Sequence, residues 1–126
     1  MKRLKKNADS DKKPWYVQQH EENENIKDEQ KRLITEAYNI FMKKYRDKFK
    51  DYDMGGKPEY DYTLTEYRFY VGRYEYISAL GTEVFKTVNL QIRKDLTFYV
   101  KVKDGYVIPL NTNDPQTAVE EFVKEL

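Results

Sequence analysis

Residues 60–76 read YDYTLTEYRFYVGRYEY, a stretch that holds six tyrosines and one phenylalanine. Many of these rings are two residues apart, which is typical of β-strands because successive strand side chains point to opposite faces of a sheet. Tyrosine brings a large apolar ring and a hydroxyl that needs a partner when it is buried. The stretch therefore predicts a tyrosine-rich sheet that either forms a core or presents a binding face.

Gly72-Arg73 predicts a two-residue hairpin turn within this stretch, because glycine suits the first central position of such a turn. The turn would pair Val71 with Tyr74. One face of the hairpin would then carry Tyr67, Phe69, Val71, Tyr74 and Tyr76, and the other Arg68, Tyr70, Glu75 and Ile77. The aromatic residues of this stretch before Thr65 have even numbers, whereas Tyr67 and Phe69 have odd numbers. A bulge or bend is therefore expected near Thr65.

A run of alternating apolar residues extends from Val84 to Val102, which is too long for a single strand. A three-residue loop ending at Asp95 would divide the run and set Ile92 opposite Leu96. This register keeps the apolar side chains on one face. Asp95 is expected to take the left-handed conformation that such loops commonly need.

Two further signals place the last strand. Asp104-Gly105 is a strong hairpin signal, which would join the preceding strand to the apolar residues at 106–110. Pro109 has no backbone N–H, so this last strand is expected at a sheet edge or at its own end. The sequence therefore predicts four or five antiparallel strands between residues 60 and 110.

Helical patterns flank the strands on both sides. Steps of three and four residues predict a long helix with one apolar stripe, made of Ile26, Leu33, Ile34, Ala37, Tyr38, Phe41, Tyr45 and Phe49. Gly55-Gly56 would end this region. After the strands, Asp114 followed by Pro115 predicts a capped start for a short helix that runs to Leu126.

These elements define the expected fold class, which is α+β. One long N-terminal helix packs on a curved antiparallel sheet of four to five strands, and a short C-terminal helix follows. The 126 residues suit a single domain, expected over residues 26–126. Residues 1–25 are dense in charge and predict a flexible tail or tether. Trp15 lies in this polar segment and is expected to dock back on the domain, the alternative being that it binds a partner.

The composition excludes several classes of protein. The net charge is +1, so nucleic acid is not the expected partner, and the absence of cysteine removes disulfides and thiolate metal sites. No apolar run approaches the roughly 20 residues of a membrane-spanning helix. The chain is expected to be soluble as written and cytoplasmic by default. It would be attached to the cell envelope if an upstream lipoprotein leader had been removed.

No catalytic residue, metal ligand or cofactor site is predicted. His20 is the only histidine and lies in the expected tail, where no rigid surroundings would position it for catalysis. A calcium loop starting at Asp51 fails because Gly55 and Tyr62 occupy positions that need oxygen ligands. Carboxylates of the strand region, Glu59, Asp61, Glu66 and Glu75, are more typical of a solvated sheet face than of a proton-transfer pair.

Three functions remain open at this stage. The first is a non-enzymatic protein-interaction or accessory module. The second is a small-ligand or enzymatic pocket between sheet and helix, which would use tyrosine hydroxyls with Asp61 or Glu75, and the third is single-stranded nucleic-acid binding on the aromatic sheet. The candidate interaction surface consists of Trp15, Tyr62, Arg68, Tyr70, Arg73 and Tyr74. The oligomeric state stays open and includes a homodimer.

The order of elements over residues 26–110, together with the lysine- and tyrosine-rich composition, resembles the cystatin-like fold. In particular, it is similar to small cystatin-like lipoproteins and accessory proteins of low-GC Gram-positive bacteria. That resemblance implies a lipidated cysteine upstream of the tail, and this chain has no cysteine. The Gln-x-Val-x-Gly hairpin of protease-inhibiting cystatins is absent, so protease inhibition is not expected. The nuclear-transport-factor-like fold ranks second, because it usually has more helices before the strands.

Overall fold

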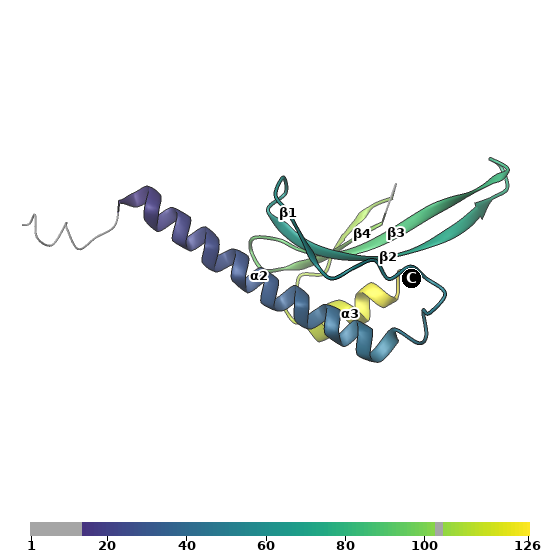
Figure 1. Ribbon diagram of the computed structural model, residues 1–126, viewed down its shortest axis with the longest axis horizontal. Helices are drawn as coiled ribbons and strands as arrows, with labels where there is room; N and C mark the ends of the chain where they lie inside the picture. The colour runs from purple at the N-terminus through teal and green to yellow at the C-terminus, as the bar shows by residue number, and fades with distance from the viewer. Residues whose placement is uncertain (1–13, 103–104) are drawn as a thin grey trace, which may run out of the picture.

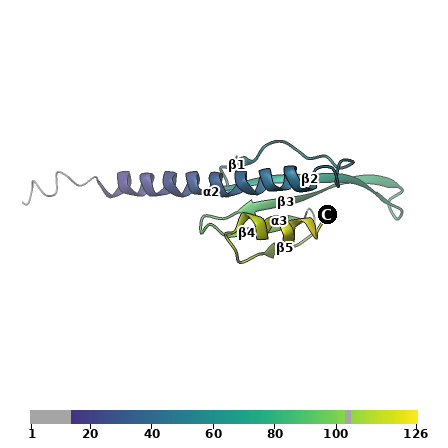
Figure 2. The same ribbon diagram turned by 90° about the horizontal axis from the view of Figure 1, so that it is seen from below.

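The computed structural model of the chain describes residues 14–102 and 105–126. Its elements are α2 (Trp15–Tyr45), β1 (Glu59–Asp61), β2 (Glu66–Ile77), β3 (Thr82–Ile92), β4 (Phe98–Val102), β5 (Val107–Pro109) and α3 (Pro115–Val123). The strands form one antiparallel sheet in the order β1-β2-β3-β4-β5. Both helices lie on the same face of this sheet (Figures 1 and 2). The predicted α+β class and layout are confirmed.

Helix α2 buries the central part of the predicted apolar stripe, with Leu33, Ile34, Ala37 and Phe41 facing the sheet. The helix begins at Trp15 instead of Ile26, where the sequence predicted its start. Residues 15–25 are therefore helical, although nearly all of their side chains are exposed. Residues 1–13 of the expected tail lie outside the described residues, and the domain boundary at residue 26 stays a prediction.

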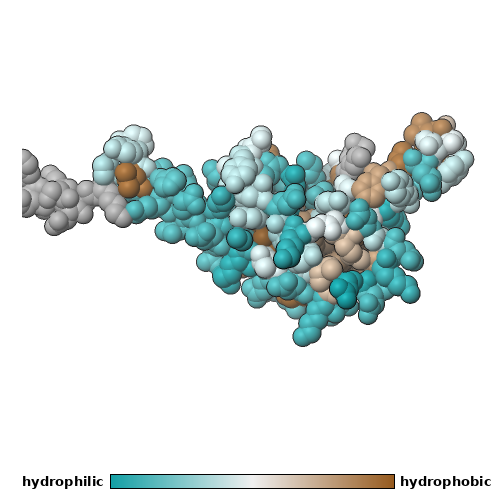
Figure 3. Space-filling model, in the orientation of Figure 1, coloured by the Kyte–Doolittle hydropathy of each residue, from teal (hydrophilic) through white to brown (hydrophobic). Residues whose placement is uncertain are grey.

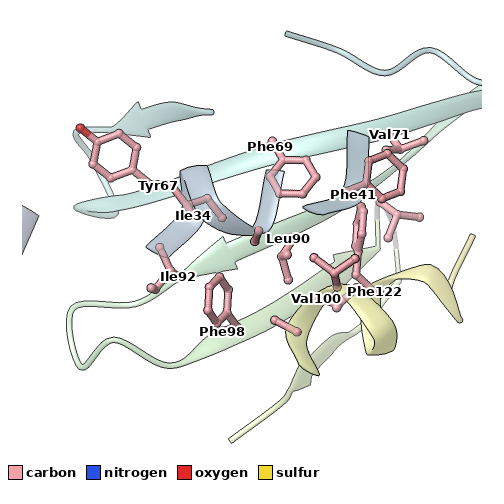
Figure 4. Close-up of a cluster of buried hydrophobic side chains, with 14 of the residues drawn as sticks. Ile34, Phe41, Tyr67, Phe69, Val71, Leu90, Ile92, Phe98, Val100 and Phe122 are labelled. Carbon is pink, nitrogen blue, oxygen red and sulfur yellow. The ribbon is translucent and has the colours of Figure 1, made fainter. Parts of the chain in front are cut away.

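The core fills the space between the helices and the sheet (Figure 4). At its centre, the Phe41 ring lies 5.6 Å from that of Phe122 on α3 and 6.1 Å from that of Phe69 on β2, measured between ring centroids. The sheet completes the core with Val71, Leu90, Ile92, Phe98 and Val100, each almost fully buried. Burying one side chain of this size stabilises the fold by roughly 1.5–3 kcal/mol, so this cluster is the main source of stability.

The predicted turn at Gly72-Arg73 is wrong. Strand β2 runs through both residues, with Gly72 opposite Thr87 of β3, and the chain turns only at residues 78–81. Gly72 is needed for space: a Cβ atom there would lie 2.4 Å from Cζ of Phe85. Because the strand is continuous, Tyr74 and Tyr76 lie on the opposite face from Phe69, not on the same face as the predicted hairpin required.

The residues of β3 and β4 lie on the predicted faces of the sheet, but the two strands pair in a different register. Ile92 lies opposite Phe98 and not Leu96, a shift of two residues that leaves the apolar face whole. Leu96 takes the left-handed conformation (φ 69°), while the Asp95 side chain accepts a hydrogen bond from the Thr97 N–H. The expected left-handed residue was therefore the wrong one.

The other two strand connections agree better with the sequence. The bend expected near Thr65 is a turn between β1 and β2, and Thr65 has a φ of 56°. Strands β4 and β5 pair across the predicted Asp104-Gly105 hairpin, of which residues 103–104 lie outside the described residues. Strand β5 with Pro109 is at the sheet edge, as predicted.

Helix α3 begins as the sequence predicts. Asp114 is the N-cap, and Pro115 follows at the first helical position. The Asp114 carboxylate accepts hydrogen bonds from the Thr117 hydroxyl (2.6 Å) and the Thr117 N–H (3.0 Å). These two bonds hold the pKa of Asp114 below its usual value of 3.8. The cap orients α3 so that Ala118, Val119 and Phe122 enter the core.

Replacing Asp114 with alanine is expected to lower the melting temperature at pH 7. Because the folded-state pKa is depressed, this stabilisation is present above the unfolded pKa of about 3.8 and is lost as the pH falls through the lower folded pKa. The gap between the two melting temperatures should therefore narrow in acid, which thermal unfolding followed by circular dichroism can measure. Asp114→Asn keeps an acceptor oxygen and should remain more stable than the alanine variant. A gap that does not change with pH would contradict this account.

Candidate interaction surface

The face of the sheet opposite α2 and α3 carries the candidate site, and we call it the outer face. Residues of even number on β2 point to it, because their odd-numbered neighbours Phe69 and Val71 point into the core. The pairing of strands extends this face across the sheet. Its side chains include Arg68, Tyr70, Tyr74 and Tyr76 from β2, Phe85, Thr87, Asn89 and Gln91 from β3, and Tyr99 and Lys101 from β4.

A polar hollow of about 440 Å³ lies on the outer face. It is lined by Glu59, Arg68, Tyr70, Thr87, Asn89, Gln91 and Lys101. The Arg68 guanidinium is held by Asp61, with 2.5 Å between Nη1 and Oδ2. The Tyr70 ring leans on the neighbouring loop, where a Cβ on Gly55 would lie 2.9 Å from its Cε1. The hollow therefore presents hydrogen-bond donors and acceptors on a rigid sheet.

A buried hydrogen-bond network forms the floor beside this hollow. The Gln91 amide donates to the Tyr99 hydroxyl at 2.8 Å and to Glu66 at 3.2 Å, and the Tyr99 hydroxyl donates to Glu66. Burial first, and then the bond to Glu66, raise the pKa of Tyr99 far above its usual value. Tyr99 therefore stays protonated and donates a hydrogen bond at neutral pH. The network holds the side chains of the floor in one arrangement.

Asp61, by contrast, is held as an anion. Its carboxylate accepts hydrogen bonds from the backbone N–H groups of Leu64 and Thr63, at 3.0 and 2.9 Å. The Leu64 bond is the main cause that lowers the pKa of Asp61, and Arg68 adds to it. An ionised, paired carboxylate anchors the turn between β1 and β2 and holds no proton to donate at neutral pH.

Beyond the hollow, β2 and β3 continue as a two-stranded ribbon over residues 73–87, which we call the arm. In the part of the chain that the structure describes, β1 and β4 do not pair with it. The arm projects away from the helices, and hydrophobic residues gather at its tip (Figures 1 and 3). On its outer face, Tyr74 is 69% exposed and Tyr76 is 63% exposed. The Tyr74 ring lies 5.0 Å from that of Phe85.

The opposite side of the arm is charged. Glu75 lies 3.3 Å from the Lys86 ammonium and 3.7 Å from the Arg73 guanidinium. Arg73 also donates a hydrogen bond of 3.0 Å to the Tyr52 hydroxyl. The arm is therefore a ribbon with one aromatic and one ionic side.

The six residues predicted for the interaction surface lie in four places. Arg68, Tyr70 and Tyr74 share the outer face. Arg73 lies on the other side of the sheet, since the turn that would have exposed it beside Tyr74 does not form. Tyr62 lies in the turn between β1 and β2. The surface was thus only partly predicted.

Trp15 occupies the far end of α2 and is 77% exposed. Its ring contacts that of Tyr16 edge to face, with 6.0 Å between centroids. The expected docking of this tryptophan on the domain is wrong. The helix carries it away from the sheet, because α2 begins before the segment that packs (Figure 1).

The space between the helices and the sheet is closely filled. Two spaces that border it have volumes of about 90 Å³ each, well below the roughly 300 Å³ at which small-molecule pockets begin. Among the described residues, no group of three or more histidines and carboxylates could hold a metal ion. Neither described helix has an apolar stretch long enough to cross a bilayer.

Comparison with models of protein families, with curated proteins and with solved structures found no match to this chain.

Proposed function

We propose that this protein is a non-enzymatic protein-binding module whose contact surface is the outer face of the arm together with the adjoining hollow. The observation that carries the proposal is the exposure of Tyr74 and Tyr76 on a projecting two-stranded ribbon. Such a ribbon is only marginally stable by itself in water, and tyrosine is enriched among the residues that dominate binding energy at protein interfaces. A partner that covers these rings would stabilise the arm and bury apolar area.

The hollow supports the same proposal. Interfaces combine apolar anchors with a polar rim, and Arg68, Asn89 and Lys101 supply such a rim next to the arm. Three carboxylates near the same face, Glu59, Asp61 and Glu66, disfavour a phosphate backbone as the ligand. The interface between the helices and the sheet is filled with side chains, which disfavours the alternative function in which a small molecule binds there. The layout of one long helix over an antiparallel sheet also supports assigning the domain to the cystatin-like class that its sequence resembles.

A photo-crosslinking amino acid placed at Tyr74 tests this proposal. In an extract of the source organism, irradiation is expected to yield a discrete adduct with one protein. Asn39, an exposed residue of α2, provides the control position, from which the same adduct should not form. If position 74 gives no adduct, or gives only those seen from position 39, the arm is not a protein-binding surface.

Affinity then distinguishes a specific contact from proximity. With the crosslinked partner purified, the double substitution Tyr74→Ser and Tyr76→Ser is expected to weaken binding by about 30-fold or more, the loss typical of interface hot spots. Tyr106→Ser is the matched control, because Tyr106 is similarly exposed but lies outside the arm. Circular dichroism should show that all variants fold. Equal losses for both variants would contradict a site on the arm.

A further inference from the structure

The aromatic rings of Tyr60 and Tyr62 form a corner beside α2. Tyr60 lies in β1 and Tyr62 in the turn that follows it. Their ring centroids are 4.8 Å apart, and the ring planes are nearly perpendicular at 80°. The buried ring of Tyr67 on β2 contacts that of Tyr60 edge to face, with 4.8 Å between centroids. The two walls of the corner thus come from residues two positions apart in one chain segment.

A cation already occupies this corner. The Nζ atom of Lys27, on α2, lies 4.4 Å from the centroid of the Tyr60 ring and 5.0 Å from that of Tyr62. Both distances fall within the roughly 6 Å over which a ring face attracts a cation. Among the described residues, no carboxylate lies within ion-pairing distance of the Lys27 ammonium. The two rings are therefore a cation-binding site that the protein fills with its own lysine.

Lysine is a weak occupant of such a site. Its ammonium is strongly hydrated and carries three N–H donors, which ring faces satisfy less well than water does. A trimethylammonium group carries the same charge without N–H donors, and aromatic corners of this kind recognise it. Such a ligand therefore gains the same electrostatic attraction with less loss of hydration than lysine does.

The surroundings allow such a ligand to enter. Tyr62 is 77% exposed, so the corner opens to solvent on that side. A space of about 90 Å³ borders Tyr60 and is lined by Asn23, Ile26 and Gln30 of α2 and by Thr65 and Lys94. Lys27 is half-buried on the helix surface, and its long flexible side chain can swing out without moving the backbone.

We propose that Tyr60 and Tyr62 bind a trimethylammonium group, either of a small molecule such as choline or of a trimethylated lysine side chain, by displacing Lys27. This site lies at the β1 end of the sheet, away from the arm, and does not depend on the function proposed above. Binding a small quaternary ammonium compound there would also release the contact that ties this part of α2 to the turn between β1 and β2.

Choline titrated into the full chain, followed by NMR of the backbone amides near Lys27 and Tyr62, tests the proposal. We expect saturable shifts in these amides. Lys27→Gln removes the internal competitor and should tighten choline binding several-fold. Tyr62→Leu keeps apolar bulk but removes the ring face, and should weaken binding about tenfold. Tyr106→Leu is the matched control and should leave binding unchanged.

Further probes test whether binding depends on the charge of the ligand or only on its apolar shape. They also distinguish a small-molecule ligand from a protein side chain. The neutral isostere 3,3-dimethylbutan-1-ol should not bind, and equal binding of this alcohol would overturn a cation site. Binding of choline alone supports a small-molecule ligand, whereas preference for a trimethyllysine peptide over its unmodified form supports a protein side chain. If neither choline nor the peptide binds Lys27→Gln, the proposal is wrong and the corner serves only to hold Lys27.

Discussion

Replacing Phe41 with alanine is expected to lower the free energy of unfolding by about 3–5 kcal/mol. The Phe41 ring is 1% exposed and joins α2, α3 and β2 through its contacts with Phe122 and Phe69. The cavity left behind would be bordered by the ends of two helices, which cannot collapse without losing their contact with the sheet. Since domains of this size are typically stable by about 5–15 kcal/mol, this loss would be a large fraction of the total stability. Denaturant titration followed by circular dichroism measures the loss.

Tyr16→Ala provides the control for this prediction, because it removes an aromatic ring from the same helix at an exposed position. It should change the free energy of unfolding by less than about 0.5 kcal/mol. If the two variants lost similar stability, helix propensity and not core packing would be the cause.

Gly72→Val should destabilise the protein by about 1–3 kcal/mol, even though valine is a better strand former than glycine. The Phe85 ring occupies the space that the new side chain needs, since its Cζ would lie only 2.4 Å from the added Cβ atom. Gly72 also exchanges two backbone hydrogen bonds of 2.7 Å with Asp53, so the strand cannot easily move away. Thermal and denaturant unfolding would detect the effect.

The double variant Gly72→Val with Phe85→Ala isolates the cause. Removing the ring makes room for valine. The double variant should therefore lose at least about 0.5 kcal/mol less stability than the two single variants lose in sum. Strict additivity would show that the glycine is required for a reason other than space.

Gly72 also shows why the sequence predicted the strands better than their connections. Glycine at the start of a tight turn and glycine beneath a neighbouring ring are indistinguishable in one sequence, because both positions exclude a side chain. The alternation from Val84 to Val102 placed the core faces correctly, since any register shifted by two residues keeps the same faces. The start of α2 was missed for a different reason: the polar residues 15–25 carry no apolar stripe.

The sequence predicted the candidate surface correctly only where it assigned strand residues to the right face of the sheet. Arg68 and Tyr70 precede Gly72 and lie on the outer face, as their alternation indicates. Tyr76 was missed as a surface residue, because the mistaken turn assigned it to the core side. A single strand running through Gly72 places its ring on the outer face. The Lys27 contact with two tyrosines joins segments far apart in the sequence, and nothing in the local pattern indicates it.

The ionic side of the arm has a consequence for self-association. A ribbon that ends a sheet exposes unpaired backbone groups on which strands of other copies can align into aggregates. Strands that added to either edge of the arm would bring further charged side chains next to Arg73, Glu75 and Lys86 and would need to match their signs. This requirement disfavours open-ended stacking of copies of the chain, even though the aromatic side of the arm is exposed.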